Sequence, residues 1–278
     1  MRWQGGREGG GVEDRRGMGI PLAGGGIGAA VLALIGYFFF GVNPDTTMQV
    51  VNQLDGGTPE QHGKEGTPGD QAGRFVDVIS ANINDVWAGK IRSYQEPRVV
   101  LYERGTATGC GFGQSAMGPF YCPNDRTVYL DLGFWREMQD QLGASGSDFA
   151  HAYVIAHEFG HHIQNLTGTM RDLRGASDSR ESVALELQAD CYAGVWAANA
   201  AASSGGKVSL EAGDIEEGLK TANAIGDDKL QRRATGHVTP ENFTHGSSAQ
   251  RVAWLKRGYQ SGDPSQCDTF HAASTGAR

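Results

Sequence analysis

Two histidines four residues apart, His157 and His161, are the residues of this sequence best placed to do chemistry. They belong to the run His-Glu-Phe-Gly-His, and side chains four apart on an α-helix lie on one face, one above the other. Two imidazoles so placed can bind one Zn²⁺ ion. Glu158, next to the first histidine, would lie near an open coordination position and could accept a proton from a water there. The run therefore predicts a hydrolytic zinc site, with one ion per chain and Glu158 as its general base.

A second acidic motif, Glu-Leu-Gln-Ala-Asp, begins at Glu186, 25 residues after His161. Hydrolytic zinc sites use three protein ligands and keep a fourth position open, so Glu186 is our candidate for the third ligand. Asp190 lies one helical turn later and could accept the free N–H of a zinc-binding imidazole, fixing its orientation. Glu181 is a rival ligand, although Asp178 and Glu181 together are also typical of a capping box at a helix N-terminus.

These motifs give the chain a resemblance to a known family. The segments HEFGHHIQ and ELQADCYAGVW, the opening MRWQGGRE with VEDRRG, and GPFYCPNDRTVYLD resemble those of the neutral zinc metallopeptidases of bacterial membranes. The resemblance covers nearly the whole chain. It implies a zincin-like catalytic domain with zinc peptidase activity on a peptide or protein substrate, and it names no particular substrate.

Peptidases of this kind also use a donor from the C-terminal part of the chain to bind the oxyanion formed on the scissile carbonyl. His245 precedes an expected helix and Arg251 projects from its first turns, so either residue could serve. His237 is a weaker candidate. We interpret the remaining histidines as packing or solvated residues, namely His62, His151, His162 and His271.

The expected reaction is metal-assisted hydrolysis of a peptide bond. Zinc held by His157, His161 and Glu186 acidifies a water, and Glu158 takes its proton and later delivers it to the leaving amine. One alternative is a membrane-tethered binding or scaffold protein that keeps the zinc fold without turnover. Another is a zinc hydrolase that acts on something other than peptides.

The N-terminal part of the chain resembles a membrane anchor followed by a tether. Residues 17–42 carry no charge and are long enough to span a bilayer as a helix. Arg15 and Arg16 precede this stretch and Asp45 is the first charge after it, so the positive-inside rule places the N-terminus in the cytoplasm. A cleaved signal peptide is the alternative, but no small-residue cleavage site follows the apolar run.

The chain is therefore expected to have four parts. These are a cytoplasmic start (1–18), a transmembrane signal anchor (19–42), a Gly- and Pro-rich flexible linker (43–73) and the catalytic domain (74–278). With this topology the protein would be a single-pass protein of the bacterial cytoplasmic (inner) membrane, and its catalytic domain would be extracytoplasmic.

Hydrophobic spacing within the domain predicts a small sheet followed mostly by helices, which is an α+β pattern. We expect a helix from about Phe75 to Ile91, a strand at 98–103, a hairpin at 119–131, and further helices near 133–142, 148–166, 179–202, 209–225 and 247–260. In a zincin-like domain the hairpin is our candidate for the sheet edge along which an extended substrate lies.

Charge and cysteine content restrict the function further. The formal net charge is −8, and beyond residue 42 there are 29 acidic and 20 basic residues, which argues against a nucleic-acid partner. The four cysteines all follow the apolar segment, where an oxidising environment would favour disulfides, and three connectivities are possible. We expect the pairs Cys110–Cys122 and Cys191–Cys267. The alternatives are a cysteine-containing zinc site, or Cys191 as a small buried apolar residue.

Overall fold

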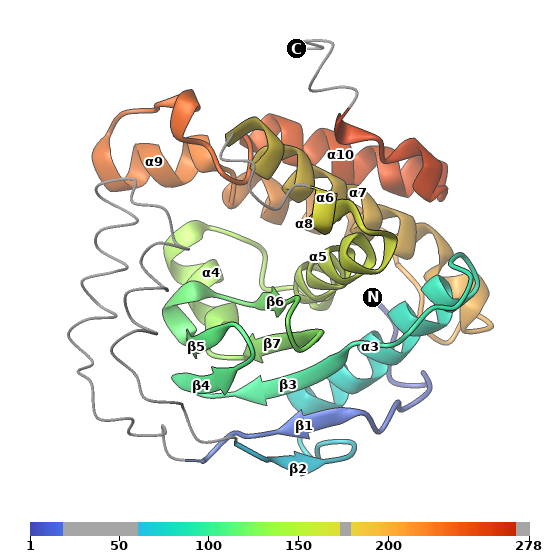
Figure 1. Ribbon diagram of the computed structural model, residues 1–278. Coiled ribbons are helices and arrows are strands. Elements are labelled where there is room, and N and C mark those ends of the chain that lie inside the picture. Colours follow the sequence, from blue (N-terminus) through green and yellow to red (C-terminus); the bar gives the residue numbers. More distant parts are fainter. Residues whose placement is uncertain (19–60, 173–178, 271–278) are drawn as a thin grey trace.

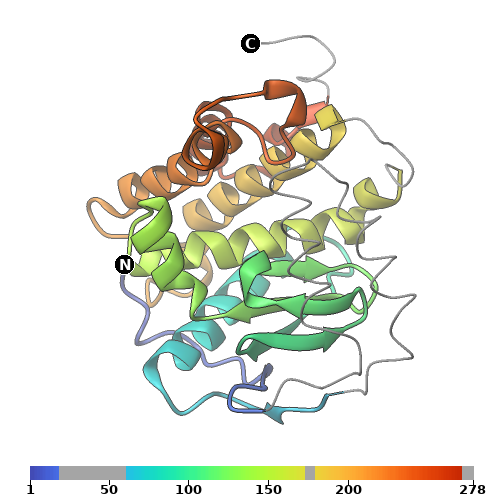
Figure 2. The ribbon, with the colours of Figure 1, turned by 90° about the vertical axis from the view of Figure 1, so that its left-hand side faces the viewer.

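The computed structural model describes residues 1–18, 61–172 and 179–270. Figures 1 and 2 show a sheet at one side, the helices α3 (Gln71–Ala88) and α5 beside it, and a group of helices beyond α5. The central helix is α5, and the outer group is formed mainly by α7, α8 and α10. This is the α+β architecture that the sequence predicts. The bounds are Asp148–Thr167 for α5, Ser179–Ser203 for α7, Asp214–Ala224 for α8 and Ser248–Ser261 for α10.

The main sheet has five strands in the order β2-β1-β3-β7-β6. β1, β3 and β7 run parallel, whereas β2 and β6 are antiparallel to their neighbours, so the sheet is mixed. The predicted hairpin at 119–131 is confirmed as β6 and β7, and β6 forms one edge of the sheet, beside α5 (Figure 1). The strands are β1 (Val12–Asp14), β2 (Lys64–Glu65), β3 (Arg98–Tyr102), β6 (Phe120–Cys122) and β7 (Thr127–Asp131).

Alternation along the strands gives the sheet two different faces. Val99 and Leu101 of β3 join the large core beneath the helices, while Val100 and Tyr102 join a small cluster on the other face. A separate hairpin of β4 (Gly105–Thr108) and β5 (Gly111–Gln114) adjoins this second cluster.

Both expected disulfide bonds are present, which confirms the predicted pairing. Cys110 and Cys122 join the loop between β4 and β5 to the edge strand β6, with their Cα atoms 5.8 Å apart. Cys191 of α7 is bonded to Cys267 near the end of the described chain, with a Cα separation of 5.6 Å.

Residues 1–18 are part of this domain, which corrects the expected division of the chain. β1 lies between β2 and β3, and Trp3 is buried with its Nε1 donating to Asp148 at the start of α5 (2.8 Å). Arg15, expected as a topology signal, is buried and paired with Glu13 at 2.7 Å. A single membrane crossing between residues 18 and 61 would separate β1 from β3, yet the two are hydrogen-bonded neighbours. The short, polar sequence Val-Glu-Asp gives no period-2 signal, and this is why β1 is missed from sequence alone.

The expected transmembrane segment (19–42) and the larger part of the expected linker lie outside the described residues. The described end of that linker, 61–73, contains β2 and the start of α3 (Gln71–Ala88), whose N-cap Asp70 accepts a hydrogen bond from Gly73 N at 3.0 Å. No helix in the described part of the chain is sufficiently long and apolar to cross a bilayer.

The expected helices are present with shifts of up to five residues at their ends, and α6 and α9 are additional. Ser147 caps α5 by accepting from Ala150 N, and Gly168 ends it in a left-handed conformation, as the sequence predicts. The polar sequence of α9 has no apolar stripe to reveal it. The remaining helices are α4 (Phe134–Leu142), α6 (Thr169–Asp172) and α9 (Asp227–Thr235), with 3₁₀ turns at Ser115–Met117, Pro240–Asn242 and Pro264–Gln266.

Glycines allow the helices α5, α7 and α10 to approach one another closely. A Cβ atom at Gly160 of α5 would lie 2.9 Å from the Cα atom of Ala189 on α7. One at Gly258 of α10 would lie 1.9 Å from the carbonyl oxygen of Cys191, also on α7. These contacts fix α7 between α5 and α10, and so place the acidic motif of α7 opposite the histidines of α5.

Candidate metal centre

His157 and His161 of α5 meet Glu186 of α7 in a compact group. His157 Nε2 lies 3.1 Å from Glu186 Oε2, and His161 Nε2 lies 3.4 Å from Glu186 Oε1. One ligand atom from each of the three residues lies within 4.8 Å of the other two, so the group could hold a metal ion. Glu181, the rival ligand, is outside this group. Asp178, its expected capping partner, lies outside the described residues.

Both imidazoles are held through their Nδ1 atoms. His157 Nδ1 contacts Asp190 Oδ1 and His161 Nδ1 contacts Gln164 Oε1, each at 2.9 Å. Because both partners offer acceptor oxygens, we assign the Nδ1 proton to each ring, which leaves both Nε2 lone pairs for a metal. Two imidazole nitrogens and one carboxylate oxygen form a donor set typical of catalytic zinc, and these residues therefore fit that ion.

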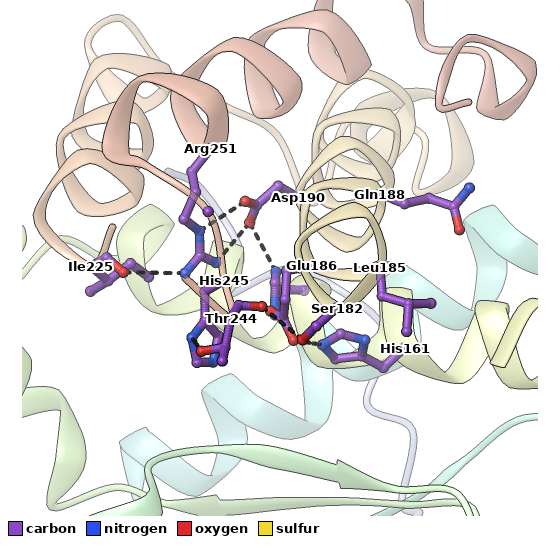
Figure 3. Close-up of polar contacts among 12 residues, drawn as sticks. His161, Ser182, Leu185, Glu186, Gln188, Asp190, Ile225, Thr244, His245 and Arg251 are labelled. Atoms are coloured by element: carbon purple, nitrogen blue, oxygen red, sulfur yellow. Dashed lines mark hydrogen bonds and ion pairs between the residues drawn. The ribbon is translucent and has the colours of Figure 1, made fainter. Parts of the chain in front are cut away.

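Asp190 lies at the centre of a buried hydrogen-bond network behind the ligands. Its Oδ1 accepts from Tyr153 Oη at 2.6 Å, and Arg251 donates to it twice, from Nε to Oδ2 and from Nη2 to Oδ1, both at 2.9 Å. Arg251 also donates from Nη1 to the carbonyl of Ile225 at 3.4 Å (Figure 3). The guanidinium is therefore engaged with the support of the metal ligands. Its side-chain contacts are thus with Asp190, Tyr153 and the carbonyl of Ile225, and a role of Arg251 in binding the oxyanion stays a prediction.

His161 is connected to the second disulfide through two glutamines. Gln164 donates from Nε2 to Gln188 Oε1 at 3.1 Å and to the carbonyl of Leu185 at 2.7 Å. Gln188 in turn donates from Nε2 to the carbonyl of Cys267 at 2.9 Å. Neither glutamine was among the predicted site residues. Gln164 lies three residues after His161 on the same helix. This spacing makes their side chains neighbours, and it could have identified Gln164 as a partner of His161.

Glu158 is buried beside the ligands, with a relative exposure of 6 %. Burial raises the pKa of its carboxyl, while the two neighbouring imidazoles act in the opposite direction. Within the described residues no hydrogen bond engages this carboxyl, which suits a group that must accept and release a proton.

Opposite charges dominate the electrostatics of the metal-free site. Burial alone would lower the pKa of His157, but the carboxylates of Asp190 and Glu186 outweigh it and raise that pKa to about 10. The pKa of Glu186 is held well below its usual value in spite of burial, chiefly by His161 and His245. A metal ion must displace protons from the imidazoles, and its affinity therefore rises with pH.

His245 lies close enough to Glu186 for the two side chains to shift each other's pKa, and its loop is held by Asp227. Figure 3 shows His245 with Thr244 beside the ligand group. One carboxylate oxygen of Asp227 accepts from three successive backbone N–H groups, at 2.7 Å from Thr244, 2.7 Å from His245 and 3.0 Å from Gly246. The other lies 3.3 Å from His245 Nδ1. Ser182 of α7 also donates to the carbonyl of Thr244 at 2.9 Å. Asp227 was not predicted, because it is far from the motifs and begins the unrecognised α9.

The other described histidines lie away from the ligand group. His162 is buried, with Nδ1 3.0 Å from Tyr121 Oη and Nε2 2.7 Å from the carbonyl of Gln95, so it is a packing residue. His151 is stacked on Trp135, with a ring-centroid separation of 4.8 Å. His237 is exposed. His271 lies outside the described residues.

Comparison with known proteins agrees with this geometry. The site could bind a metal ion through His157, His161 and Glu186. The family model described as "Putative neutral zinc metallopeptidase" matches residues 1–270, and the chain belongs to that family.

Several relatives are similar over most of their length. The uncharacterized protein YpfJ of Escherichia coli (strain K12) is 45 % identical over 294 residues, covering 97 % of this chain and 99 % of that protein. The uncharacterized protein Rv2575 of Mycobacterium tuberculosis (strain H37Rv) is 46 % identical over 220 residues, covering 75 % of each chain. No solved structure matches the chain.

Proposed function

We propose that this protein is a zinc-dependent endopeptidase with a zincin-like catalytic domain and one zinc ion per chain. The observation that carries the proposal is the group of His157, His161 and Glu186, whose ligand atoms lie within 4.8 Å of one another next to the buried Glu158. Membership of the zinc metallopeptidase family supports the same reaction.

Each side chain of the site has a separate role in the proposed hydrolysis. Zinc, when bound, supplies an acidified water and polarises the scissile carbonyl. Glu158 accepts the proton of the attacking water and then gives it to the leaving amine. Asp190 and Gln164 hold the two imidazoles so that their Nε2 atoms face Glu186.

His245 is our candidate for binding the developing negative charge on the scissile oxygen. Its Nδ1 faces Thr244 Oγ1 at 2.9 Å and Asp227, which leaves Nε2 available as a donor. Burial lowers the pKa of this ring, but Glu186 and Asp227 outweigh burial and raise the pKa, favouring the cationic form. A cationic donor binds an oxyanion more strongly than a neutral one.

The substrate is proposed to bind as an extended chain along β6. This strand is the edge of the sheet next to α5, and its outer backbone groups can pair with a peptide as an added strand. Side-chain selectivity would then arise from the surfaces that flank β6.

We propose that the domain operates in an oxidising compartment outside the cytoplasm, because it contains two disulfides and no free cysteine among its described residues. Since β1 belongs to the sheet, residues 1–18 lie on the same side as the rest of the domain.

A direct test is to assay the full-length chain against a diverse peptide library before and after metal removal. The whole chain is required because residues 1–18 supply β1. We expect about one zinc per chain and cleavage that is lost with a chelator and restored by zinc. His157→Ala should abolish zinc binding, and the exposed His237→Ala should leave it unchanged. A stable, zinc-loaded wild-type protein that cleaves no peptide would support a scaffold role instead.

A further inference from the structure

A groove of about 540 Å³ lies at the end of the edge strand β6. Its walls come from the loop after α3, from the β6–β7 turn and from the last turns of α5. We call it the arginine groove because Arg92 and Arg126 stand on its two loop walls. The other lining residues are Ile91, Ser93, Gln95, Pro123, Asn124, Asn165 and Leu166.

The arginine groove begins one helical turn beyond a metal ligand. Asn165, which lines it, follows His161 by four residues on α5, so the two side chains lie on neighbouring turns of one face. Asn165 donates to Tyr121 Oη at 2.8 Å and to the carbonyl of Pro123 at 3.3 Å. These bonds join the helix to β6 and the turn after it. A peptide that paired with β6 near the metal ligands would therefore extend into this groove.

The two guanidinium groups lack carboxylate partners within the described residues. The side-chain contact of Arg126 is with a neutral group, Gln95 Oε1, at 2.6 Å. Arg92 has no side-chain hydrogen bond or ion pair in the described part of the chain. The groove therefore carries two guanidinium groups without a direct ion pair among the described residues, although Asp125 and Glu96 adjoin its lining in sequence.

The backbone of the groove is held in an unusual conformation at two positions. Ser93 and Arg126 have φ angles of 60° and 55°, in the left-handed region that non-glycine residues seldom adopt. Arg98 N donates to the carbonyl of Arg126 at 3.1 Å, and His162 Nε2 donates to the carbonyl of Gln95 at 2.7 Å. The contacts hold both loop walls in place, and strained backbone positions of this kind cluster at functional sites.

We propose that the arginine groove binds a carboxylate of the peptide substrate, either an Asp or Glu side chain or a terminal carboxylate. A planar guanidinium matches a carboxylate in shape and charge. The inference rests on the proposed peptidase function and adds a preference for acidic substrates to it.

The test measures binding in the absence of turnover. Full-length Glu158→Gln protein, loaded with zinc, is titrated with fluorescent peptides derived from one neutral, C-terminally amidated parent sequence. In one arm a single Glu or its Gln counterpart is scanned through the sequence, and in the other the amide is replaced by a free carboxylate. The two arms separate the two sources of the carboxylate.

We expect one acidic peptide to bind roughly five- to tenfold more tightly than its neutral counterpart. The double variant Arg92→Gln/Arg126→Asn should lose this preference and keep its affinity for the neutral parent. Asparagine is used at position 126 because it tolerates a positive φ. The control is Arg257→Gln, an exposed arginine on α10, which should keep the preference.

Equal binding of acidic and neutral peptides, or a preference that survives in the double variant, would overturn the proposal. If the wild-type chain still cleaves the neutral parent in that case, the proposed function stands and the groove assignment alone fails. If no peptide is bound or cleaved, both are wrong.

Discussion

Arg251 of α10 donates two hydrogen bonds to Asp190 of α7, both at 2.9 Å, and neither side chain is exposed by more than 5 %. Asp190 in turn holds His157, the first metal ligand, at 2.9 Å. The pair therefore connects the C-terminal helix to the metal centre. Arg251 and His157 together hold the pKa of Asp190 at about 2 despite its burial, so this carboxylate stays ionised at neutral pH.

Replacing Arg251 with Gln should remove the guanidinium charge that compensates the buried Asp190 carboxylate, leaving only His157 and Tyr153 beside it. We expect a loss of roughly 3–5 kcal/mol in unfolding free energy and a zinc affinity lowered about 10- to 100-fold. Denaturant unfolding and competitive zinc titration measure the two effects. Arg257→Gln, on the same helix but exposed, removes only a cation–π contact with Trp254, so it should keep the wild-type zinc affinity and cost far less stability. Wild-type zinc affinity in Arg251→Gln would show that Asp190 positions His157 without help from α10.

Reduction of Cys191–Cys267 should weaken the metal site before the protein unfolds. The bond closes a loop of 76 residues, and chain-entropy reasoning gives it on the order of 4 kcal/mol of stability. It also fixes Cys267, whose carbonyl holds Gln188, and Gln188 supports Gln164 and His161. The double variant Cys191→Ala/Cys267→Ala should thus bind zinc more weakly while still folded.

The matched control for that experiment is Cys110→Ala/Cys122→Ala, whose loop spans 12 residues and which contacts no metal ligand. It should lose less stability and keep its zinc affinity. Equal zinc affinity in both double variants would refute the link between the second disulfide and His161.

Acid should release the N-terminal strand. The pKa of Glu13 is lowered, since Arg15 and Gly63 outweigh the effect of burial, and Arg16 lowers the pKa of Asp70 to about 2. Groups with lowered pKa stabilise the folded state fully above their unfolded values, 4.5 and 3.8, and this stabilisation is lost as the pH falls below them. We expect hydrogen exchange in β1, corrected for its intrinsic pH dependence, to accelerate between about pH 4.5 and 2 before exchange in α5.

Glu13→Gln is the comparison for the acid experiment, because it removes one titrating group from the strand. The variant should show faster exchange in β1 at neutral pH and a smaller change on acidification. Exchange that accelerates in β1 and α5 together at every pH would indicate a strand docked by apolar contacts alone.

Asp227 should affect the catalytic rate because it holds His245 in position. Asp227→Asn keeps the shape of the carboxylate but weakens its hold on the loop at 244–246, and we expect kcat to fall about 10- to 100-fold with KM and zinc content little changed. His245→Ala should behave similarly, and combining the two should add little, since both act on one donor. The neighbouring Asp228 anchors Ser248 at 2.6 Å, and Asp228→Asn should cost stability without this kcat effect. An unchanged kcat in Asp227→Asn would remove His245 from the mechanism.

Much of the site could be predicted from sequence because its spacing is local. His157, Glu158 and His161 share one helix, and Glu186 and Asp190 share another, so each set follows from helical periodicity. Arg251 and Asp227 could not be assigned, because their roles depend on how α10 packs on α7 and how α9 packs on α8 and α10. β1 could not be predicted for the same reason. Its three residues have a mostly polar sequence, and they form a strand only because they pair with β3, which lies far along the chain.

The most direct test of the central claim is the hydrolysis rate of zinc-loaded Glu158→Gln protein. The substitution keeps the shape of the side chain and all three ligands but removes the proton acceptor. The mechanism predicts full zinc content and a kcat lowered by roughly two to four orders of magnitude against the best library peptide. Turnover equal to that of the wild type, at equal zinc content, would contradict the assignment of Glu158 as the general base.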